Sequence, residues 1–279
     1  EDLPVHPFAR SVPTLLSGLA KDNWASAATA IMTTDTVAKL VTRQVGLSDG
    51  VITMTGIAKG SGMICPDMAT MLAYVATDAQ VPQAVLQALL QEAVAGSFNA
   101  ITGDGDTSTN DACVLLASGS SVVRVDNADS ADGRLLREAL NAVCSELAER
   151  IVRDGEGATK LVRIRVASAA DREEARTVAY TVAHSPLVKT ALFASDPNWG
   201  RILAAVGRSG IEDLEIDRVC IWLGDVAIVS GGGRDPAYTE AAGQAVMRDS
   251  EILIRIDLGR GAATTELLTC DLSYDYVKI

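Results

Sequence analysis

Apolar and polar residues alternate along much of the first half of the chain in a way that predicts β-strands. Two runs rich in β-branched residues, Val37 to Val45 and Val51 to Ala58, flank Ser48-Asp49-Gly50, and this spacing predicts a hairpin. A shorter apolar run, Ala112 to Ala117, follows a polar loop and also predicts a strand. The apolar run from Thr70 to Val75 fits a strand or a helix equally well by pattern alone.

Other segments repeat their apolar residues at the helical spacing of three to four positions. Ala9 to Leu19, Asn23 to Ile31 and Pro82 to Ala95 predict helices, and Asn23 stands where an N-cap residue is expected. Arg134 to Val152 is the clearest amphipathic segment, because one stripe collects most of its apolar residues. That stripe consists of Leu135, Leu136, Ala139, Val143, Leu147 and Ile151.

The pattern changes after Gly155-Glu156-Gly157, where short apolar runs begin to alternate with helical segments. The predicted strands are 161–166, 219–229 and 252–256, and the predicted helices are 172–183, 197–206 and 240–248. Strands and helices mixed in this way indicate a second α+β domain. We therefore expect two domains, residues 1–159 and residues 160–279.

Composition limits the classes of protein to which the chain can belong. Of its 279 residues, 48% are hydrophobic and 22% are charged, as in ordinary globular proteins. The net charge of −12 argues against nucleic-acid binding, which needs clustered positive charge. No run approaches the roughly 20 apolar residues of a membrane-spanning helix, and the start EDLPVHPF lacks the features of a secretion signal. We expect a cytoplasmic protein with no membrane partner.

The candidate metal- and cofactor-binding motifs lack residues that such motifs require. The stretch that begins Asp104-Gly105-Asp106 starts like a calcium loop but lacks the glycine at the sixth position and the glutamate at the twelfth. No His, Cys and carboxylate cluster has metal-ligand spacing. The cysteines show no C-x-x-C pattern and predict buried thiols in a reducing compartment. They are Cys65, Cys113, Cys144, Cys220 and Cys270. We expect no bound metal and no prosthetic group.

Thr70 stands where a Gly/Pro-rich loop gives way to an apolar run. Most threonines in such a position begin a strand or cap a helix. The alternative is a nucleophile: a threonine that attacks the carbonyl of Ala69 becomes, after cleavage, an N-terminal residue with a hydroxyl and a free α-amine. The amine can then act as the base, so the scarcity of histidine, only His6 and His184, is no obstacle. We expect His184 to be a surface turn residue.

The amino-acid sequences of several whole segments favour the interpretation of Thr70 as a nucleophile. The stretch KGSGMICPDMATML, which begins at Lys59, resembles a motif of the ornithine acetyltransferase family, also called the glutamate N-acetyltransferases. Seven further segments resemble signatures of that family and occur in the same order, so the resemblance spans the chain. They are MTTDT from Met32, SFN from Ser97, DGDTSTND from Asp104, DGEGA from Asp154, SPLVKT from Ser185, SDPNWGR from Ser195 and DLSYDYV from Asp271.

The resemblance implies an acetyltransferase that matures by self-cleavage between Ala69 and Thr70. Thr70 would take the acetyl group of N2-acetylornithine as an ester and pass it to glutamate, a ping-pong cycle that yields ornithine and N-acetylglutamate. Some members of the family also accept acetyl-CoA, which would be a substrate here and not a cofactor. The family's substrate-binding residues correspond to Thr33 or its neighbour Thr34, to Lys59, to Thr70 and to Glu156.

Each of these residues also has an ordinary interpretation. Lys59 could be a solvated loop lysine, Thr33 could bond only to local backbone, and Glu156 could be an exposed turn acid. Two other functions remain open beside acetyl transfer. A paralogous acyltransferase, amidohydrolase or aminopeptidase would use the same threonine ester, and an inactive truncated module would form no ester.

The fold of the family implies a mixed α+β protein. A layered helix-sheet-sheet-helix nucleophile domain would be followed by a smaller α+β domain, and the cut α and β pieces would stay together, commonly as an α2β2 heterotetramer. The Thr-Gly pair that forms the family's oxyanion hole comes before the segment that resembles the start of this chain, and an asparagine and a short tail that contact substrate come after Ile279. We therefore expect the oxyanion hole upstream of Glu1 and none within this chain.

Overall fold

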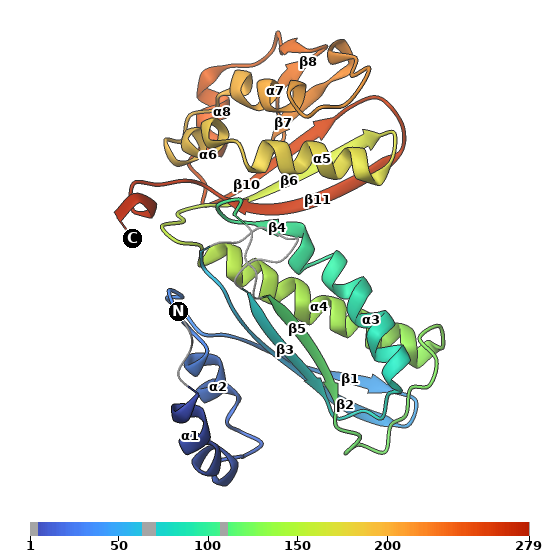
Figure 1. The fold of residues 1–279 in the computed structure, drawn as a ribbon. Helices are drawn as coiled ribbons and strands as arrows, with labels where there is room; N and C mark the ends of the chain where they lie inside the picture. Colours follow the sequence, from blue (N-terminus) through green and yellow to red (C-terminus); the bar gives the residue numbers. More distant parts are fainter. Residues whose placement is uncertain (1–4, 63–70, 107–110, 279) are drawn as a thin grey trace.

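The structure, a computed structural model, describes residues 5–62, 71–106 and 111–278. These residues form two β-sheets with helices packed on them, so the mixed α+β class expected from the sequence is confirmed (Figure 1). One sheet has four strands from the first half of the chain, and the other has seven strands, mainly from the second half. Within the described ranges, no helix is long and apolar enough to cross a membrane.

The first sheet has the strand order β1-β2-β3-β5. β1 (Lys39–Leu47) and β2 (Gly50–Lys59) form the predicted hairpin. β3 (Leu72–Thr77) lies antiparallel to β2, and β5 (Ala112–Ala117) lies parallel to β3. The apolar run that the pattern left open is therefore a strand over its described residues, as the family resemblance implied.

Helices α3 (Gln83–Ala95) and α4 (Ala131–Arg153) pack on this sheet. α4 begins three residues earlier than predicted because Ser130 caps it: the serine hydroxyl accepts a hydrogen bond from the Gly133 N–H at 2.9 Å. The predicted apolar stripe of α4 is buried except for Leu135, which is 39% exposed. Leu135 is the exception because it lies about 100° around the helix from the buried Leu136.

Two short helices precede the first sheet. α1 (His6–Ser17) has no buried residue, and α2 (Trp24–Ala30) contacts β1 and β2. Asn23 occupies the N-cap position of α2, as predicted, but its side chain does not cap the helix. Instead the amide donates a hydrogen bond to the Gly18 carbonyl at 2.8 Å, so the preceding turn takes the group that would have capped α2.

The second sheet has the strand order β4-β11-β6-β10-β7-β8-β9. Its strands are β4 (Ile101–Thr102), β6 (Leu161–Ala169), β7 (Cys220–Leu223), β8 (Val226–Ser230), β9 (Gly233–Arg234), β10 (Glu251–Asp257) and β11 (Ala263–Cys270). The associated helices are α5 (Arg172–Ala183), α6 (Pro186–Phe193), α7 (Trp199–Gly207) and α8 (Glu240–Met247). Single 3₁₀ turns cover Phe98–Ala100, Ile216–Arg218 and Tyr276–Lys278.

The second sheet and its helices differ from the prediction in several features. The segment 219–229, predicted as one strand, is a hairpin, because Gly224 has a φ of +54° and reverses the chain between β7 and β8. β11 and α6 were not predicted. The sequence of β11, ATTELLTC, mixes polar and apolar residues without strict alternation, and α6 is only eight residues long, so neither gives a strong periodic signal.

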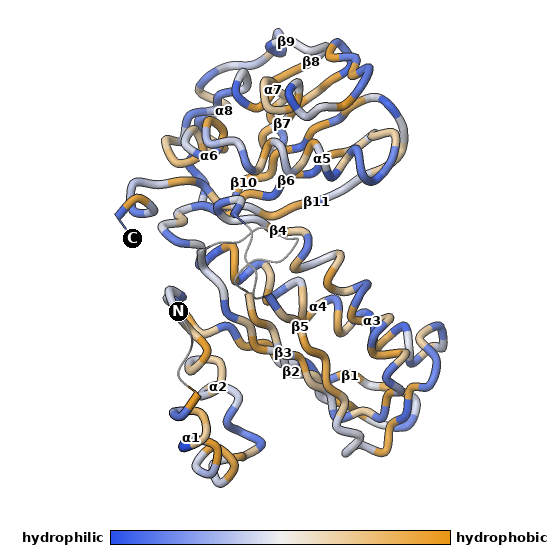
Figure 2. The backbone as a smooth tube through the Cα atoms, viewed as in Figure 1, coloured by the Kyte–Doolittle hydropathy of each residue, from blue (hydrophilic) through white to orange (hydrophobic). Residues whose placement is uncertain are grey.

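The buried apolar residues form two clusters that meet at the second sheet. Leu161 and Leu268 belong to the cluster that includes α4, whereas their neighbours Val162 and Leu267 belong to the cluster that includes α5. Successive residues of a strand point to opposite faces, so β6 and β11 contribute to both clusters. Figure 2 shows hydrophobic residues along the strands of both sheets. The domain boundary between residues 159 and 160 stays a prediction.

Candidate active site

Lys59 is the last residue of β2 and is only 6% exposed. Its Nζ lies 3.4 Å from the hydroxyl of Thr33, in the loop between α2 and β1. The structure therefore brings together two of the predicted substrate-binding residues. The interpretation of Lys59 as a solvated loop lysine is wrong, because β2 extends through it and the surrounding chain covers it. Among the described residues, no carboxylate forms an ion pair with Lys59.

Ala69 and Thr70, the predicted cleavage site and nucleophile, lie outside the described residues. The residue that follows them, Met71, is described and is only 9% exposed. Its backbone N–H donates a hydrogen bond to the carboxylate of Asp111 at 2.6 Å. Lys59 pairs with Leu72 across the β2–β3 ladder. The chain just after the predicted nucleophile is therefore held next to the buried lysine.

A buried ionic network adjoins Lys59 and Thr33. Lys39, the first residue of β1, is fully buried, and its Nζ lies 2.6 Å from Asp35 Oδ1 and 2.6 Å from Asp154 Oδ2. Buried charges are tolerated only when each has hydrogen-bond partners. Asp35 accepts further bonds from the Gly60 N–H at 2.8 Å and the Thr33 N–H at 3.1 Å. Burial alone would raise the pKa of Asp35, but these N–H groups and Lys39 outweigh it and lower that pKa below its ordinary value.

Asp154 extends the network to Glu156. The Thr36 N–H donates to the Asp154 carboxylate at 3.0 Å, and the Thr36 hydroxyl donates there as well. The Ser61 hydroxyl donates to the Asp154 carbonyl at 2.5 Å, and the Glu156 N–H donates to the Ser61 carbonyl at 3.1 Å. The loop with Thr33, the end of β2 and the turn with Glu156 are thus tied to one buried group of charges.

The side chain of Glu156 lies against the backbone of Gly62. A Cβ at position 62 would stand 2.4 Å from the carboxyl carbon of Glu156, so only glycine allows this approach. Glu156 is half-buried. The interpretation of Glu156 as an exposed turn acid is therefore wrong, because the chain of residues 61–62 covers one side of it.

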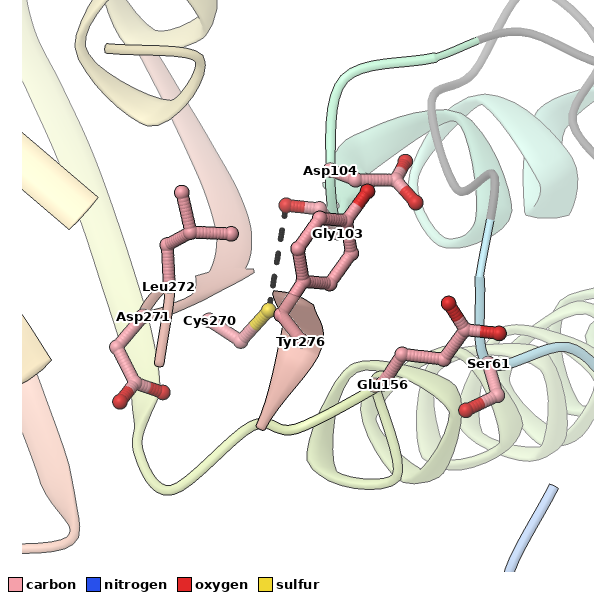
Figure 3. A pocket seen from close by; sticks show the side chains of 9 residues that line it. Ser61, Gly103, Asp104, Glu156, Cys270, Asp271, Leu272 and Tyr276 are labelled. Carbon is pink, nitrogen blue, oxygen red and sulfur yellow. Dashed lines mark hydrogen bonds between the residues drawn. The ribbon is translucent and has the colours of Figure 1, made fainter. Parts of the chain in front are cut away.

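A small pocket of about 10 Å³, enough for roughly one water molecule, opens beside Glu156 (Figure 3). Ser61, Asp104, Cys270 and Tyr276 also line it, and the Cys270 Sγ donates a weak hydrogen bond to the Gly103 carbonyl at 3.9 Å. Burial raises the pKa of Tyr276, and the negative charges of Asp104, Asp106 and Glu156 raise it further. The carboxylates of Asp104, Glu156 and Asp271 line the pocket and favour an ammonium group in a ligand. The Nζ of the buried Lys189, 4.0 Å from the Cys270 Sγ, acts in the opposite direction.

His184 is not the surface turn residue that the sequence predicted. It follows α5, is half-buried, and its Nε2 lies 3.1 Å from the hydroxyl of Thr102. The rings of His184 and Tyr180 are 5.3 Å apart between centroids. Burial, together with the positive charge of Lys189, lowers the pKa of His184. The prediction failed because strand β4 brings Thr102 to this place from a distant part of the sequence.

The cysteines and acids of the described ranges form no evident metal site. Within those ranges, no group of three or more His, Cys, Asp and Glu side chains could hold a metal ion. Cys144 and Cys270 are buried thiols, as predicted, whereas Cys113 and Cys220 are half-buried. Cys65 lies outside the described residues. The absence of a metal or prosthetic group stays a prediction.

Comparison with known proteins agrees with the family read from the motifs. The model of the ArgJ family matches residues 1–279. The chain is 56% identical over 279 residues to the arginine biosynthesis bifunctional protein ArgJ of Methylococcus capsulatus, covering 100% of this chain and 68% of that protein. It is 53% identical over 282 residues to the protein of the same name from Pseudomonas fluorescens, with 100% and 69% covered.

A solved structure is also similar. The crystal structure of the arginine biosynthesis bifunctional protein ArgJ from Bacillus halodurans has a TM-score of 0.68 and 37% sequence identity, covering 72% of this chain and 94% of that chain. The chain belongs to the ArgJ family. The family membership predicted from the sequence motifs is thereby confirmed.

The sequence reasoning missed the residues that organise the site. Asp35, Asp111 and Asp154 lie within the family motifs but had no predicted role, and Lys39 was not singled out. A signal for Lys39 does exist, because it stands four residues after Asp35 and opens an apolar strand where a free charge would be costly. Its second partner, Asp154, is 115 positions away, so only the fold reveals that contact.

Proposed function

We propose that this chain is a glutamate N-acetyltransferase, which moves the acetyl group of N2-acetylornithine to glutamate through an ester on Thr70. Two findings support this function. The chain belongs to the ArgJ family over its whole length. In addition, Lys59 is buried at the end of β2, with its Nζ 3.4 Å from the Thr33 hydroxyl. It pairs there with Leu72, the first residue of β3, which directly follows Met71. That second finding, a covered lysine with no ion-pair partner among the described carboxylates, carries the proposal.

In the first half-reaction, the Thr70 hydroxyl attacks the acetyl carbonyl carbon of N2-acetylornithine. The free α-amine of Thr70 takes the hydroxyl proton, because an amine with an ordinary pKa near 8 is partly unprotonated at neutral pH. The bond between the acetyl carbon and the nitrogen breaks, and the proton passes to the departing nitrogen. Ornithine leaves, and the acetyl group stays on Thr70 as an ester.

In the second half-reaction, the amine of glutamate attacks the ester carbonyl. The bond between the acetyl carbon and the Thr70 oxygen breaks, the oxygen regains a proton, and N-acetylglutamate leaves. The same hydroxyl performs the maturation step: it attacks the Ala69 carbonyl, the carbon–nitrogen bond to Thr70 breaks, and the acyl group moves to the Thr70 oxygen as an ester. Water then hydrolyses this ester, which releases the Ala69 carboxylate and restores the hydroxyl. Maturation creates the α-amine that the transfer cycle requires as its base. Acetyl-CoA is a second candidate donor to Thr70.

Three residues bind the substrates in this proposal. Lys59 pairs with an amino-acid carboxylate, because a buried ammonium binds strongly to a carboxylate that replaces its lost solvent. Thr33 adds a hydroxyl hydrogen bond beside Lys59. Glu156 binds a substrate ammonium through its carboxylate, beside the small pocket that it lines.

The remaining parts of the proposal concern assembly and surroundings. The α and β pieces on either side of the Ala69–Thr70 bond stay associated, and two of each form an α2β2 heterotetramer. Acyl transfer between amines needs neither a metal nor a prosthetic group, so no cofactor is included in the proposal. The enzyme acts in the cytoplasm on small amino-acid substrates.

Assays of the purified protein test this function. The wild-type protein should release ornithine from N2-acetylornithine and form an equal amount of N-acetylglutamate when glutamate is present. Thr70→Ala should stay uncut and lose more than about 1000-fold in rate, because it has neither the hydroxyl nor the amine. Release of free acetate in place of N-acetylglutamate would indicate a hydrolase instead, and full activity of Thr70→Ala would overturn the proposal.

A further inference from the structure

Asp111 holds the first described residue of the chain that follows Thr70. Its Oδ1 accepts a hydrogen bond from the Met71 N–H at 2.6 Å, and the N–H of Ala112 donates to the Met71 carbonyl at 3.1 Å. Met71 is thus held on both its N–H and its carbonyl by two consecutive residues. The same register continues into the sheet, where Leu72 pairs with Ala112.

Lys59 lies on the other side of the same point. It pairs with Leu72 from β2, whereas Asp111 approaches from the start of β5. Burial raises the pKa of Asp111 to about 6, although the Met71 N–H and the positive charge of Lys59 act in the opposite direction. Among the charged groups of the described residues, Lys59 is the one whose charge lowers the pKa of Asp111. A carboxylate and an ammonium group thus flank the start of β3.

Met71 directly follows Thr70 in the sequence. Its N–H is held by the Asp111 carboxylate and its carbonyl by the Ala112 N–H. Because a residue held at both groups has little freedom to rotate, these bonds fix the main chain of the residue next to the proposed nucleophile.

We propose that Asp111 is a positioning residue for acetyl transfer, which acts by fixing the main chain of Met71, the residue that follows Thr70 in the sequence. This inference rests on the function proposed above. Asp111 acts through Met71 and needs no contact with the substrate. Its loss should therefore lower kcat and leave KM nearly unchanged, because substrate binding belongs to Lys59, Thr33 and Glu156.

The same sheet supplies a matched control. Asp78 follows the last residue of β3, is half-buried like Asp111, and accepts a hydrogen bond from the Thr53 N–H at 2.9 Å. The two aspartates thus make the same kind of bond at opposite ends of one strand. A role confined to holding the sheet would make Asp78→Ala and Asp111→Ala behave alike.

The experiment measures kcat and KM for N2-acetylornithine with the cleaved wild-type protein and with Asp111→Ala, Asp111→Asn and Asp78→Ala. We expect Asp111→Ala to lose about 100-fold in kcat with KM within about threefold, since a displacement of about 1 Å at the reacting atoms has an effect of that size. Asp111→Asn retains an acceptor oxygen and should recover kcat to within about tenfold of wild type. Asp78→Ala should keep the wild-type kcat.

Three results would overturn the inference: wild-type kcat in Asp111→Ala, equal losses in Asp111→Ala and Asp78→Ala, or a loss that appears in KM alone. If Asp111→Ala does not fold, the comparison of Asp111→Asn with Asp78→Asn decides in its place, and equal kcat values for these two would overturn the inference. A wild-type protein that makes no N-acetylglutamate would instead refute the proposed function, so the two failures are distinguishable.

Discussion

The two ends of the first sheet differ in whether their charged side chains are buried or exposed. At the end with Lys59, three ionic side chains are buried together, and Lys39 lies within 2.6 Å of two carboxylates. At the other end, near the β1–β2 turn, the charged groups are exposed: Asp132 accepts hydrogen bonds from Ser48 in an exposed setting. Both ends belong to the same strands and pack on the same helix, so the fold alone does not require the buried charges.

This difference indicates which end of the sheet is constrained by function. A buried ion pair is weak evidence for stability, because well-packed apolar residues can often replace it without loss. Here the buried group touches the backbone of Thr33 and of Gly60, the residue after Lys59. The network therefore holds the loops that carry the predicted substrate-binding residues. Charge is buried at the end of the sheet where ligands would bind and stays exposed at the other end.

Breaking the buried network should have the largest effect. Lys39→Met leaves Asp35 and Asp154 buried without their cation, which should lower the free energy of unfolding by about 3–5 kcal/mol. Arg43→Met, on the same strand, removes an ion pair with Glu146 whose side chains are 44% and 35% exposed, and should change it by about 0–1 kcal/mol. Urea unfolding of both variants measures the difference, and similar values would contradict the account of the two ends.

Removal of the candidate substrate lysine should have the next largest effect. Lys59→Met takes away a charged hydrogen bond to a substrate carboxylate, worth about 1.5–3 kcal/mol, so the KM for glutamate should rise roughly 10- to 100-fold. Steady-state kinetics at varied glutamate concentration measures this rise, and Arg43→Met serves as the control with an unchanged KM. An unchanged KM in Lys59→Met would remove Lys59 from the binding site.

Neutralising Asp111 should have the smallest effect, a gain in stability whose size depends on pH. Because the pKa of Asp111 is raised in the folded protein from 3.8 to about 6, its contribution to stability is complete below about pH 4 and is lost as the pH rises through about 6. Asp111→Asn cannot ionise, so its melting temperature should exceed that of the wild type by a few degrees at about pH 7.5 and match it below about pH 4. Calorimetry over this pH range tests the sign, and a lower melting temperature at about pH 7.5 would contradict it.

Much of the first half of the fold could be predicted because its signals are local. The hairpin follows from Ser48-Asp49-Gly50 between two β-branched runs, and α4 from a stripe repeated over about five turns. β11 was missed because its polar residues do not alternate strictly, although it pairs along its length with β6. Its pairing depends on a partner far earlier in the sequence, which no local pattern contains.

The candidate site likewise contains some residues that could be predicted from the sequence and others that could not. Lys59, Thr33 and Glu156 were predicted from motifs that the family resemblance supplied, and the structure links them through a single network. Asp111 and Asp154 lie inside such motifs but had no predicted role, because their partners Met71 and Lys39 are 40 and 115 positions away. Contacts over such separations depend on how the strands are ordered, and that order does not follow from residue spacing.

The central claim is that the Thr70 hydroxyl carries the acetyl group between the two amino acids. Mass spectrometry of the denatured protein after incubation with N2-acetylornithine, without glutamate, tests it most directly. The account predicts one added acetyl group on the hydroxyl of Thr70, at the start of the C-terminal piece, and its disappearance when glutamate is added. A protein that turns over both substrates while Thr70 stays unmodified, or that is acetylated at another residue, would contradict the claim.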